Sequence, residues 1–224
     1  MNKEVLSPAQ AAAKIKENDV LMIGGFLTVG EPTKIIEALV KLGTKGLTII
    51  GNDSGYDLPL PDGSRRVEGI GKLTKNDQVR KIIASYIGAN VKNQEKMATS
   101  EIETDLTPQG TLAEQIRAAG VGLGGVLTPT GVGTLRAKGR KILTIDGKKY
   151  LLEKPLHADV ALIRAKRADR SGNLVYHGTA QNFNPLMAMA AKLVIAEVDE
   201  IIDVGEIHPG DVVTPGIFVD YLVM

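Results

Sequence analysis

Short apolar runs alternate with amphipathic segments along most of this 224-residue chain. Residues 20–23 and 47–50 are almost uninterrupted apolar runs, the pattern of strands that are buried on both faces of a sheet. Between them, residues 33–42 carry apolar side chains at the spacing of one helix face, and Gly43 supplies the stop. The pattern therefore predicts a strand, a glycine-containing turn, a helix and a second strand in its first 50 residues.

The same reasoning covers the rest of the chain. Further strands are expected over 81–87, 101–107, 158–163, 174–176, 193–198 and 217–223, a hairpin over 141–155, and helices over 7–16, 91–99, 112–119 and 185–192. Because strands alternate with helices, we expect an α/β fold with an open, largely parallel sheet covered by helices and glycine-rich loops at the carboxyl ends of strands. With no long linker, residues 1–224 are expected to form a single domain.

Three segments carry more specific expectations. Residues 55–77, rich in glycine, proline, aspartate and asparagine, are expected to form a loop or a short polar excursion. Thr111, with Glu114 three residues later, is expected to build a capping box for the helix over 112–119. The charged run 164–170 is expected to be a solvated turn after a core strand, with the holding of a nucleotide phosphate as the alternative.

The glycine-rich turn at 24–30 is the expected ligand site. Glycines let the main chain approach a ligand closely, and the helix start that follows offers free N–H groups to an anion. Gly25-x4-Gly30 is followed by Glu31-Pro32 instead of Gly-Lys-Ser/Thr, which excludes a phosphate-binding loop of the Walker type. The spacing also excludes the dinucleotide fingerprint. Tight turns and close packing remain an alternative explanation of these glycines.

Composition narrows the classes of function. A net charge of +1, three Phe, five Tyr and no Trp argue against nucleic-acid binding. No cysteine is present, and the three histidines lack metal-ligand spacing, so we expect no disulfide, cysteine nucleophile or metal site. Charged residues near the start and the absence of long apolar runs predict a soluble, cytoplasmic protein without membrane contact. These residues alone therefore indicate an α/β domain without a self-contained catalytic set.

Five stretches together resemble the family I coenzyme A transferases. The first is Gly24-Gly25-Phe26-x3-Gly30-x-Pro32, after an apolar strand. The others follow in the family's order along nearly the whole chain: 107–117, 128–134, 168–174 with 180–184, and 214–219. The resemblance implies the α/β fold of that family and the transfer of coenzyme A between two carboxylic acids.

The resemblance also implies a division of labour between two chains. In the family a glutamate attacks the acyl-CoA to give a mixed anhydride, CoA thiolate then forms a glutamyl thioester, and a second acid reverses the steps. That glutamate lies in a Glu-Asn-Gly motif of the other subunit, and this chain has no such motif. The chain therefore resembles the alpha subunit, expected to be active only with a beta subunit, as an α2β2 assembly.

The resemblance assigns binding of CoA or acyl-CoA, as substrate, to one loop, with its main-chain N–H groups facing the active site. Its residues are Gly24, Gly25, Phe26, Leu27, Thr28, Val29 and Gly30. Leu27 stands where many relatives carry another glycine. Gln109, at the end of a strand, matches a glutamine near the reacting thioester; capping the next helix or supporting the loop are its alternatives. Glu31 is expected to repel a CoA phosphate, so that the loop receives the thioester or pantetheine end and the ADP phosphates lie elsewhere.

The substrate and two other functions stay open at this point. Thr128 with Val132 resembles the acetate, acetoacetate or butyrate type more than the 3-oxoadipate type. A non-catalytic α/β protein that binds a sugar phosphate or another small molecule is the main alternative, since related sheets bind sugar phosphates. An enzyme that is active as a single chain is the third.

Overall fold

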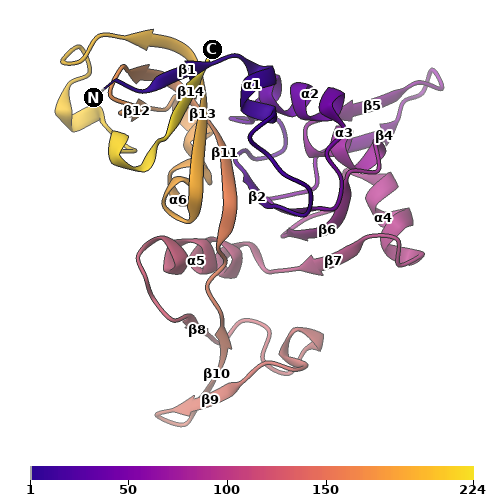
Figure 1. The fold of residues 1–224 in the computed structure, drawn as a ribbon. Coiled ribbons are helices and arrows are strands. Elements are labelled where there is room, and N and C mark those ends of the chain that lie inside the picture. Colours follow the sequence, from indigo (N-terminus) through magenta and orange to yellow (C-terminus); the bar gives the residue numbers. More distant parts are fainter. Residues whose placement is uncertain (1) are drawn as a thin grey trace.

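A computed structural model of the chain, which describes residues 2–224, has one large sheet with helices on both faces (Figure 1). Within these residues the sheet has nine strands, in the order β1-β14-β13-β11-β2-β3-β6-β7, with β12 paired to β11. Only β12 is antiparallel to its neighbour. The strands are β1 Glu4–Leu6, β2 Val20–Ile23, β3 Leu47–Ile50, β6 Val79–Ala84, β7 Glu103–Leu106, β11 Ala158–Asp169, β12 Leu174–Val175, β13 Ala191–Ile202 and β14 Tyr221–Val223. The expected α/β fold with a largely parallel sheet is confirmed.

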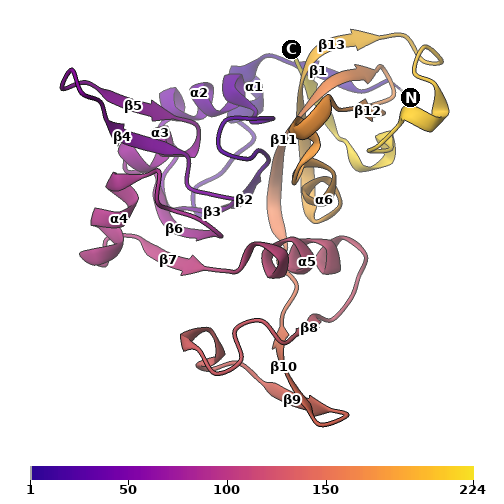
Figure 2. The same cartoon turned by 180° about the vertical axis from the view of Figure 1, so that it is seen from behind.

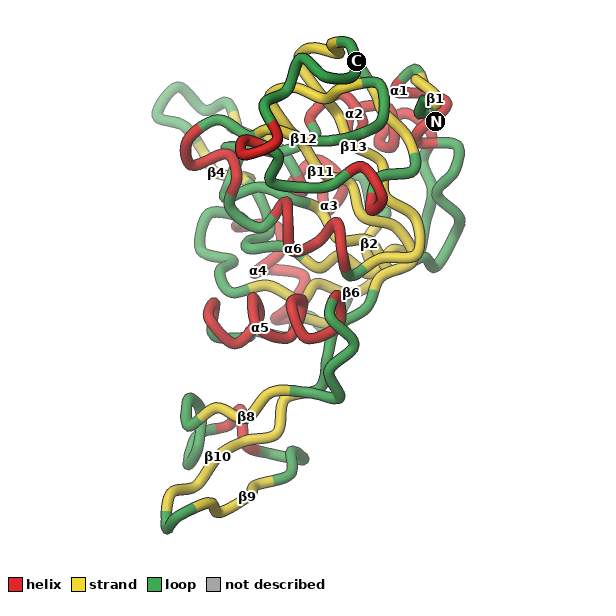
Figure 3. The backbone as a smooth tube through the Cα atoms, turned by 90° about the vertical axis from the view of Figure 1, so that its left-hand side faces the viewer, coloured by secondary structure: helices red, strands yellow, loops and turns green. Residues whose placement is uncertain are grey.

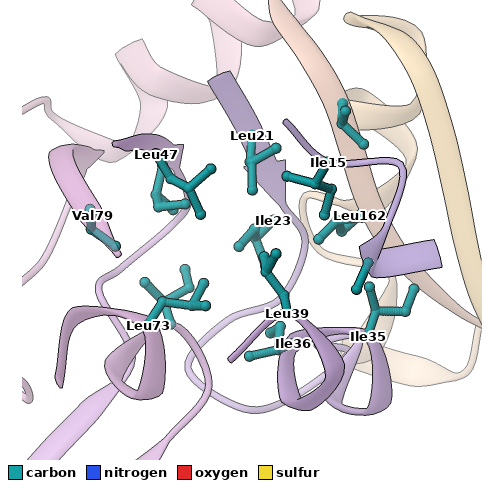
Figure 4. Close-up of a cluster of buried hydrophobic side chains, with 14 of the residues drawn as sticks. Ile15, Leu21, Ile23, Ile35, Ile36, Leu39, Leu47, Leu73, Val79 and Leu162 are labelled. Atoms are coloured by element: carbon teal, nitrogen blue, oxygen red, sulfur yellow. The ribbon is translucent and has the colours of Figure 1, made fainter. Parts of the chain in front are cut away.

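Helices pack against both faces of this sheet. They are α1 Pro8–Ala12, α2 Thr33–Leu42, α3 Ile70–Lys75, α4 Val91–Ala98, α5 Gln109–Gly120 and α6 Asn184–Met189, with 3₁₀ turns η1 Leu135–Ala137, η2 Gly178–Gln181, η3 Pro209–Asp211 and η4 Gly216–Phe218. Successive side chains of β2 point to opposite faces, so Leu21 and Ile23 pack with α2 in one core (Figure 4). Met22 packs on the other face with Leu112 of α5 and Met187 of α6. Both faces of β2 are therefore buried, which explains its continuous apolar run.

The strand order of the sheet reverses between β2 and β11. From β2 the chain adds β3, β6 and β7 on one side, whereas β13 and β14 follow β11 on the other. The carboxyl ends of these parallel strands share one edge. In an open α/β sheet, ligands bind beyond this edge at such a switch point. The loop 24–30, which directly follows β2, lies beside this point.

A smaller sheet projects from the large one (Figures 1 and 3). It contains β8 Val126–Thr128, β9 Ile142–Ile145 and β10 Lys148–Glu153, paired antiparallel in the order β8-β10-β9. The hairpin expected over 141–155 is confirmed. Arg136 joins this sheet to β7, because its guanidinium lies 2.5 Å from Asp105 and 2.8 Å from buried Glu153. A single domain over the whole chain stays a prediction.

Residues 55–77 are expected to form a loop or a short polar excursion; the expectation of a loop is wrong. They form the hairpin β4 Tyr56–Pro59 and β5 Arg65–Glu68, followed by α3 (Figure 2). Polar side chains stabilise the hairpin: Arg65 pairs with Asp57 at 2.6 Å, and Arg66 stacks over the Tyr56 ring at 3.9 Å. Its strands look polar in the sequence because the hairpin is largely exposed.

Two further expectations are wrong. The run 164–170 is not a turn: β11 continues to Asp169 and pairs with β13 as far as Ile202. The helix expected from 112 begins at Gln109, after Pro108, and no side chain caps it. Thr111 is buried inside the helix and therefore cannot form the capping box. Elsewhere the expected elements are present with shifted ends. For example, α1 is shorter than the expected helix over 7–16, and Ser7 caps it.

Within residues 2–224, each helix is too short or too polar to traverse a lipid bilayer.

Candidate functional site

The loop 24–30 forms a tight turn at the carboxyl edge of the sheet. Phe26 and Val29 exchange two backbone hydrogen bonds of 3.0 Å each, which places Leu27 and Thr28 at the tip. Leu27 has a φ of +52°, in the left-handed region that favours glycine. Phe26 and Val29 expose nearly half of their surface. The tip therefore presents both main chain and apolar side chains to solvent.

Replacing Leu27 with glycine should stabilise the turn. A non-glycine residue in the left-handed region costs about 1–2 kcal/mol, and glycine removes this cost while adding entropy to the unfolded chain. We expect a net gain of about 0.5 kcal/mol in the free energy of unfolding, measured in urea. Leu27→Ala, which keeps the strained conformation, is the matched control and should not gain stability.

The carboxylate of buried Asp53 stabilises this turn through hydrogen bonds. Its Oδ2 accepts the Leu27 N–H at 2.6 Å and an N–H of the Asn52 side chain at 2.8 Å, and its Oδ1 accepts the Gly55 N–H at 2.8 Å. Asn52 in turn accepts a hydrogen bond from Gln109 Nε2 at 2.6 Å. A chain of three hydrogen bonds thus connects Gln109 to Leu27. The structure therefore brings together two predicted segments that lie about 80 residues apart in the sequence.

Gln109 lies elsewhere than its sequence position suggested. It is the first residue of α5, instead of the end of a strand, and its side chain is exposed. It does not cap the helix, because no side-chain capping bond is present there. Its amide nitrogen is fixed by Asn52, whose own amide is fixed by Asp53. Gln109 is thus an oriented polar group at the same edge as the loop.

The segment 180–184 holds the loop from its other side. Asn182 accepts the Gly25 N–H at 3.1 Å and donates to the Val29 carbonyl at 3.0 Å. Asn184, fully buried, donates to the carbonyl oxygens of Gly30 at 3.0 Å and of Ala180 at 2.9 Å. A Cβ on Gly30 would lie 2.4 Å from the Ala180 carbonyl oxygen. Close packing is therefore one reason for this glycine.

Most N–H groups of the loop are used inside the protein. Those of Gly24, Gly25, Phe26, Leu27 and Val29 all donate to protein acceptors. Among the described residues, only Thr28 and Gly30 in this loop have N–H groups without an internal acceptor. Fewer main-chain N–H groups are thus available to a ligand than the sequence suggested.

Glu31 does not face a ligand, which corrects the expected repulsion of a CoA phosphate. It is 2% exposed and accepts the Ile70 N–H at 3.1 Å. Burial raises the pKa of Glu31 to about 8; the Ile70 N–H opposes this shift and the neighbouring Asp53 adds to it. Glu31 is accordingly neutral at pH 7, and it gives no information about which end of CoA lies at the loop.

The other motif segments meet in two places. Segments 107–117 and 128–134 line one cavity of about 550 Å³ between α5 and β8. Segments 168–174 and 214–219 pack against each other at the end of β11, where Asn173 accepts the Gly216 N–H at 2.8 Å. The sequence identified these segments but not the contacts of Asn52, Asp53 or Asn184. Within residues 2–224 no three His, Cys, Asp or Glu side chains are grouped to hold a metal ion.

Comparison with known proteins adds to this geometry. A sequence model of the family described as coenzyme A transferase matches residues 5–224. The alpha subunit of acetoacetyl-CoA:acetate/butyrate CoA transferase from Clostridium acetobutylicum is 49% identical over 100% of this chain and 98% of its own. Acetate CoA-transferase subunit alpha from Escherichia coli K12 is 45% identical, with the same coverage.

Solved structures share the fold. A thioester complex of an acyl-CoA transferase (YdiF) with CoA, from Escherichia coli O157:H7, superimposes with a TM-score of 0.87 at 24% identity. The chain is covered completely and spans 47% of that longer protein, about half its length. Glutaconate CoA-transferase from Acidaminococcus fermentans gives a TM-score of 0.84 at 22% identity, over 99% of this chain and 75% of its own. With a family match over almost its entire length and full-length relatives above 40% identity, this chain belongs to the coenzyme A transferase family of enzymes.

Proposed function

We propose that this chain is the alpha subunit of a heteromeric, cytoplasmic CoA-transferase. It moves coenzyme A between an acyl-CoA and a free short-chain carboxylic or 3-oxo acid, of the acetate, acetoacetate or butyrate type. The observation that carries the proposal is the 49% identity, over the full chain, to an alpha subunit named for these acids. The partner is a beta subunit with the Glu-Asn-Gly motif, in an α2β2 assembly.

In this proposal the nucleophile comes from the beta subunit. Its glutamate attacks the acyl carbonyl, and negative charge develops on the carbonyl oxygen before CoA thiolate leaves. This chain supplies candidate donors for that oxygen: the N–H group of Thr28 and the amide of Gln109, beside the tip residues Phe26 and Val29. A preorganised donor of this kind contributes about 3–4 kcal/mol in well-studied hydrolases.

Replacing Gln109 with alanine should lower kcat of the complex about tenfold, because the amide that Asn52 orients would no longer reach the developing charge. This loss is smaller than that of a fully buried donor because water screens the exposed side chain. Thermal unfolding should change little, since the side chain is exposed and the capping role is absent. Gln94→Ala, which removes an amide from the surface of α4, is the matched control. Unchanged kcat in Gln109→Ala would exclude a direct role.

The proposed function is tested with the chain co-expressed and purified with its beta partner. We expect exchange of CoA between acetoacetyl-CoA and acetate or butyrate, with ping-pong kinetics. The chain alone should be inactive, and so should a complex in which the glutamate of the partner's Glu-Asn-Gly motif is replaced by glutamine. Turnover by the single chain would contradict the division of labour. Tight calorimetric binding of a sugar phosphate, without CoA exchange by the complex, would contradict the proposal itself.

A further inference from the structure

A cavity of about 500 Å³ lies where β2 and β11 separate, at the switch point of the sheet. We call it the switch-point cavity. Its volume is in the range of small-molecule sites. The residues that matter for its chemistry are Gly30, Arg164, Lys166, His177, Ala180 and Asp199.

This cavity exists because β11 is longer than its neighbour β2. Register pairs Leu162 with Ile23, the last residue of β2, so β11 continues beyond that strand from Ile163 onward. Alternation along β11 then leaves Arg164 partly exposed and Lys166 exposed, while Ala165 is buried between them. Two cationic side chains therefore extend beyond the carboxyl edge of β2, next to the loop 24–30.

The charges in the cavity are unequal. Arg164 Nη2 lies 2.8 Å from one oxygen of Asp199, and Lys166 Nζ lies 3.1 Å from the other. Partial burial alone would raise the pKa of Asp199, but its hydrogen bonds to Arg164 and Lys166 lower it below the ordinary value. Two cations thus share one carboxylate, which leaves one positive charge in excess.

The lining of the cavity also includes a main-chain donor. Gly30 lines the cavity, and its N–H has no acceptor among the described residues. A phosphate or carboxylate oxygen would be a partner for this N–H as well as for the guanidinium and ammonium groups.

We propose that the switch-point cavity binds an anionic group of the substrate, either a phosphate of coenzyme A or the carboxylate of the free acid, through Arg164 and Lys166. Asp199 competes with that group for the same two side chains and so limits its affinity. The inference rests on the proposed function for the identity of the substrate. A purely structural pair of ion pairs would instead require all three side chains equally and would discriminate between no substrates.

The test uses the complex with its beta subunit and two substitutions that should change KM in opposite directions. Lys166→Gln should raise KM for the anionic substrate about two- to fivefold, the range for a half-exposed charged contact. Asp199→Asn should lower the same KM, because both cations become free. Lys192→Gln is the matched control: Lys192 is 80% exposed and pairs with Asp159 at 2.9 Å, at the amino ends of the same two strands.

The substrates separate the two sources of the anion. If the group is a phosphate, Lys166→Gln raises KM for acetyl-CoA but leaves that for acetyl-pantetheine unchanged. If it is the acid's carboxylate, KM for acetate and acetoacetate rises instead. Equal effects on all substrates, effects of the same sign in both variants, or values equal to those of Lys192→Gln would overturn the inference.

A binding measurement keeps this inference separate from the proposed function. Calorimetry of the complex with CoA, acetate and acetoacetate requires no turnover. Weaker binding of one of these ligands by Lys166→Gln, and tighter binding by Asp199→Asn, would support the cavity even if CoA exchange were absent. Exchange by the wild-type complex with unaltered affinities for all three ligands in both variants would reject the cavity and leave the proposed function standing.

Discussion

Replacing Gly24 with alanine is expected to reduce kcat/KM of the complex by more than about 100-fold, because a displacement of about 1 Å at a reacting site has effects of this size. A Cβ at this position would lie 1.8 Å from Oδ1 of Asn184, far inside van der Waals contact. Asn184 is fully buried and cannot move without losing its bonds to Gly30 and Ala180. Each carbonyl left unpaired costs about 1–3 kcal/mol. The substitution should therefore displace the whole loop 24–30.

A second substitution tests this cause directly. Asn184→Ala removes the clashing oxygen, so the double variant Gly24→Ala/Asn184→Ala should be more stable than the sum of the two single effects predicts. Thermal unfolding of the purified complex measures this coupling even where activity is lost. Gly124→Ala is the control, because no atom lies within 4 Å of its added Cβ and its φ is not positive. Wild-type kinetics in Gly24→Ala would show that the close contact does not position the loop.

The local parts of this site could be predicted from the sequence. Continuous apolar runs predicted β2 and β3, because strands buried on both faces have no polar side. The helical spacing over 33–42 and Gly43 predicted α2 with its correct ends. The loop 24–30 followed directly from the glycines between them. Each of these features depends on residues within about one turn or one strand of each other, so a linear pattern records it.

The supports of the loop could not be predicted in this way. Asp53 is 26 residues from Leu27, and Asn182 is 157 residues from Gly25. Their hydrogen bonds depend on the order of strands in the sheet, which no local pattern contains. Asn182 and Asn184 lie in a segment that resembles a family motif, but the resemblance gave no role to either side chain. Only the tertiary structure shows them bound to the loop.

The cations of the switch-point cavity illustrate a misleading signal. The many charged residues in 164–170 favoured a turn. The alternation of charged and apolar residues over Arg164, Ala165 and Lys166 was instead the signal for a strand. β11 extends beyond the end of β2 at this point, so β2 no longer covers it and its exposed positions are polar. Strands that extend past their neighbours therefore lose the continuous apolar pattern at the sheet's edge.

The position of Glu31 also could not be predicted from the sequence pattern. Beside a glycine-rich loop and a helix start, a glutamate is expected at the surface, where it would act on a ligand. In the structure its carboxyl group lies under the loop, against Gly69 and Ile70, and a Cβ on Gly69 would come within 2.2 Å of it. Asp53, Glu68 and Lys72 are the charged groups that act on it. Burial, which the sequence does not reveal, reverses its expected state from charged to neutral.

This burial makes a strong prediction for stability against pH. In the unfolded chain Glu31 loses its proton near its ordinary pKa of 4.5, whereas in the folded chain it keeps the proton up to about pH 8. Between these values the folded state binds more protons than the unfolded state, so the contribution of Glu31 falls as pH rises. The slope is about 1.4 kcal/mol per pH unit, which amounts to about 5 kcal/mol over the whole window.

Glu31→Gln should remove this loss. Glutamine has the same shape, keeps an oxygen that can accept the Ile70 N–H, and has no proton to lose. Relative to wild type, the variant should gain about 3 kcal/mol in free energy of unfolding at pH 7 and about 5 kcal/mol above pH 8. Urea unfolding at intervals from pH 5 to pH 9 measures the difference. Glu37→Gln is the control: the Lys72 ion pair lowers the pKa of exposed Glu37, so its difference from wild type should be constant over this range. If the free energy of unfolding of wild type and Glu31→Gln changed in parallel with pH, the pKa of Glu31 would be close to its ordinary value. The glutamate under the loop would then be charged at pH 7.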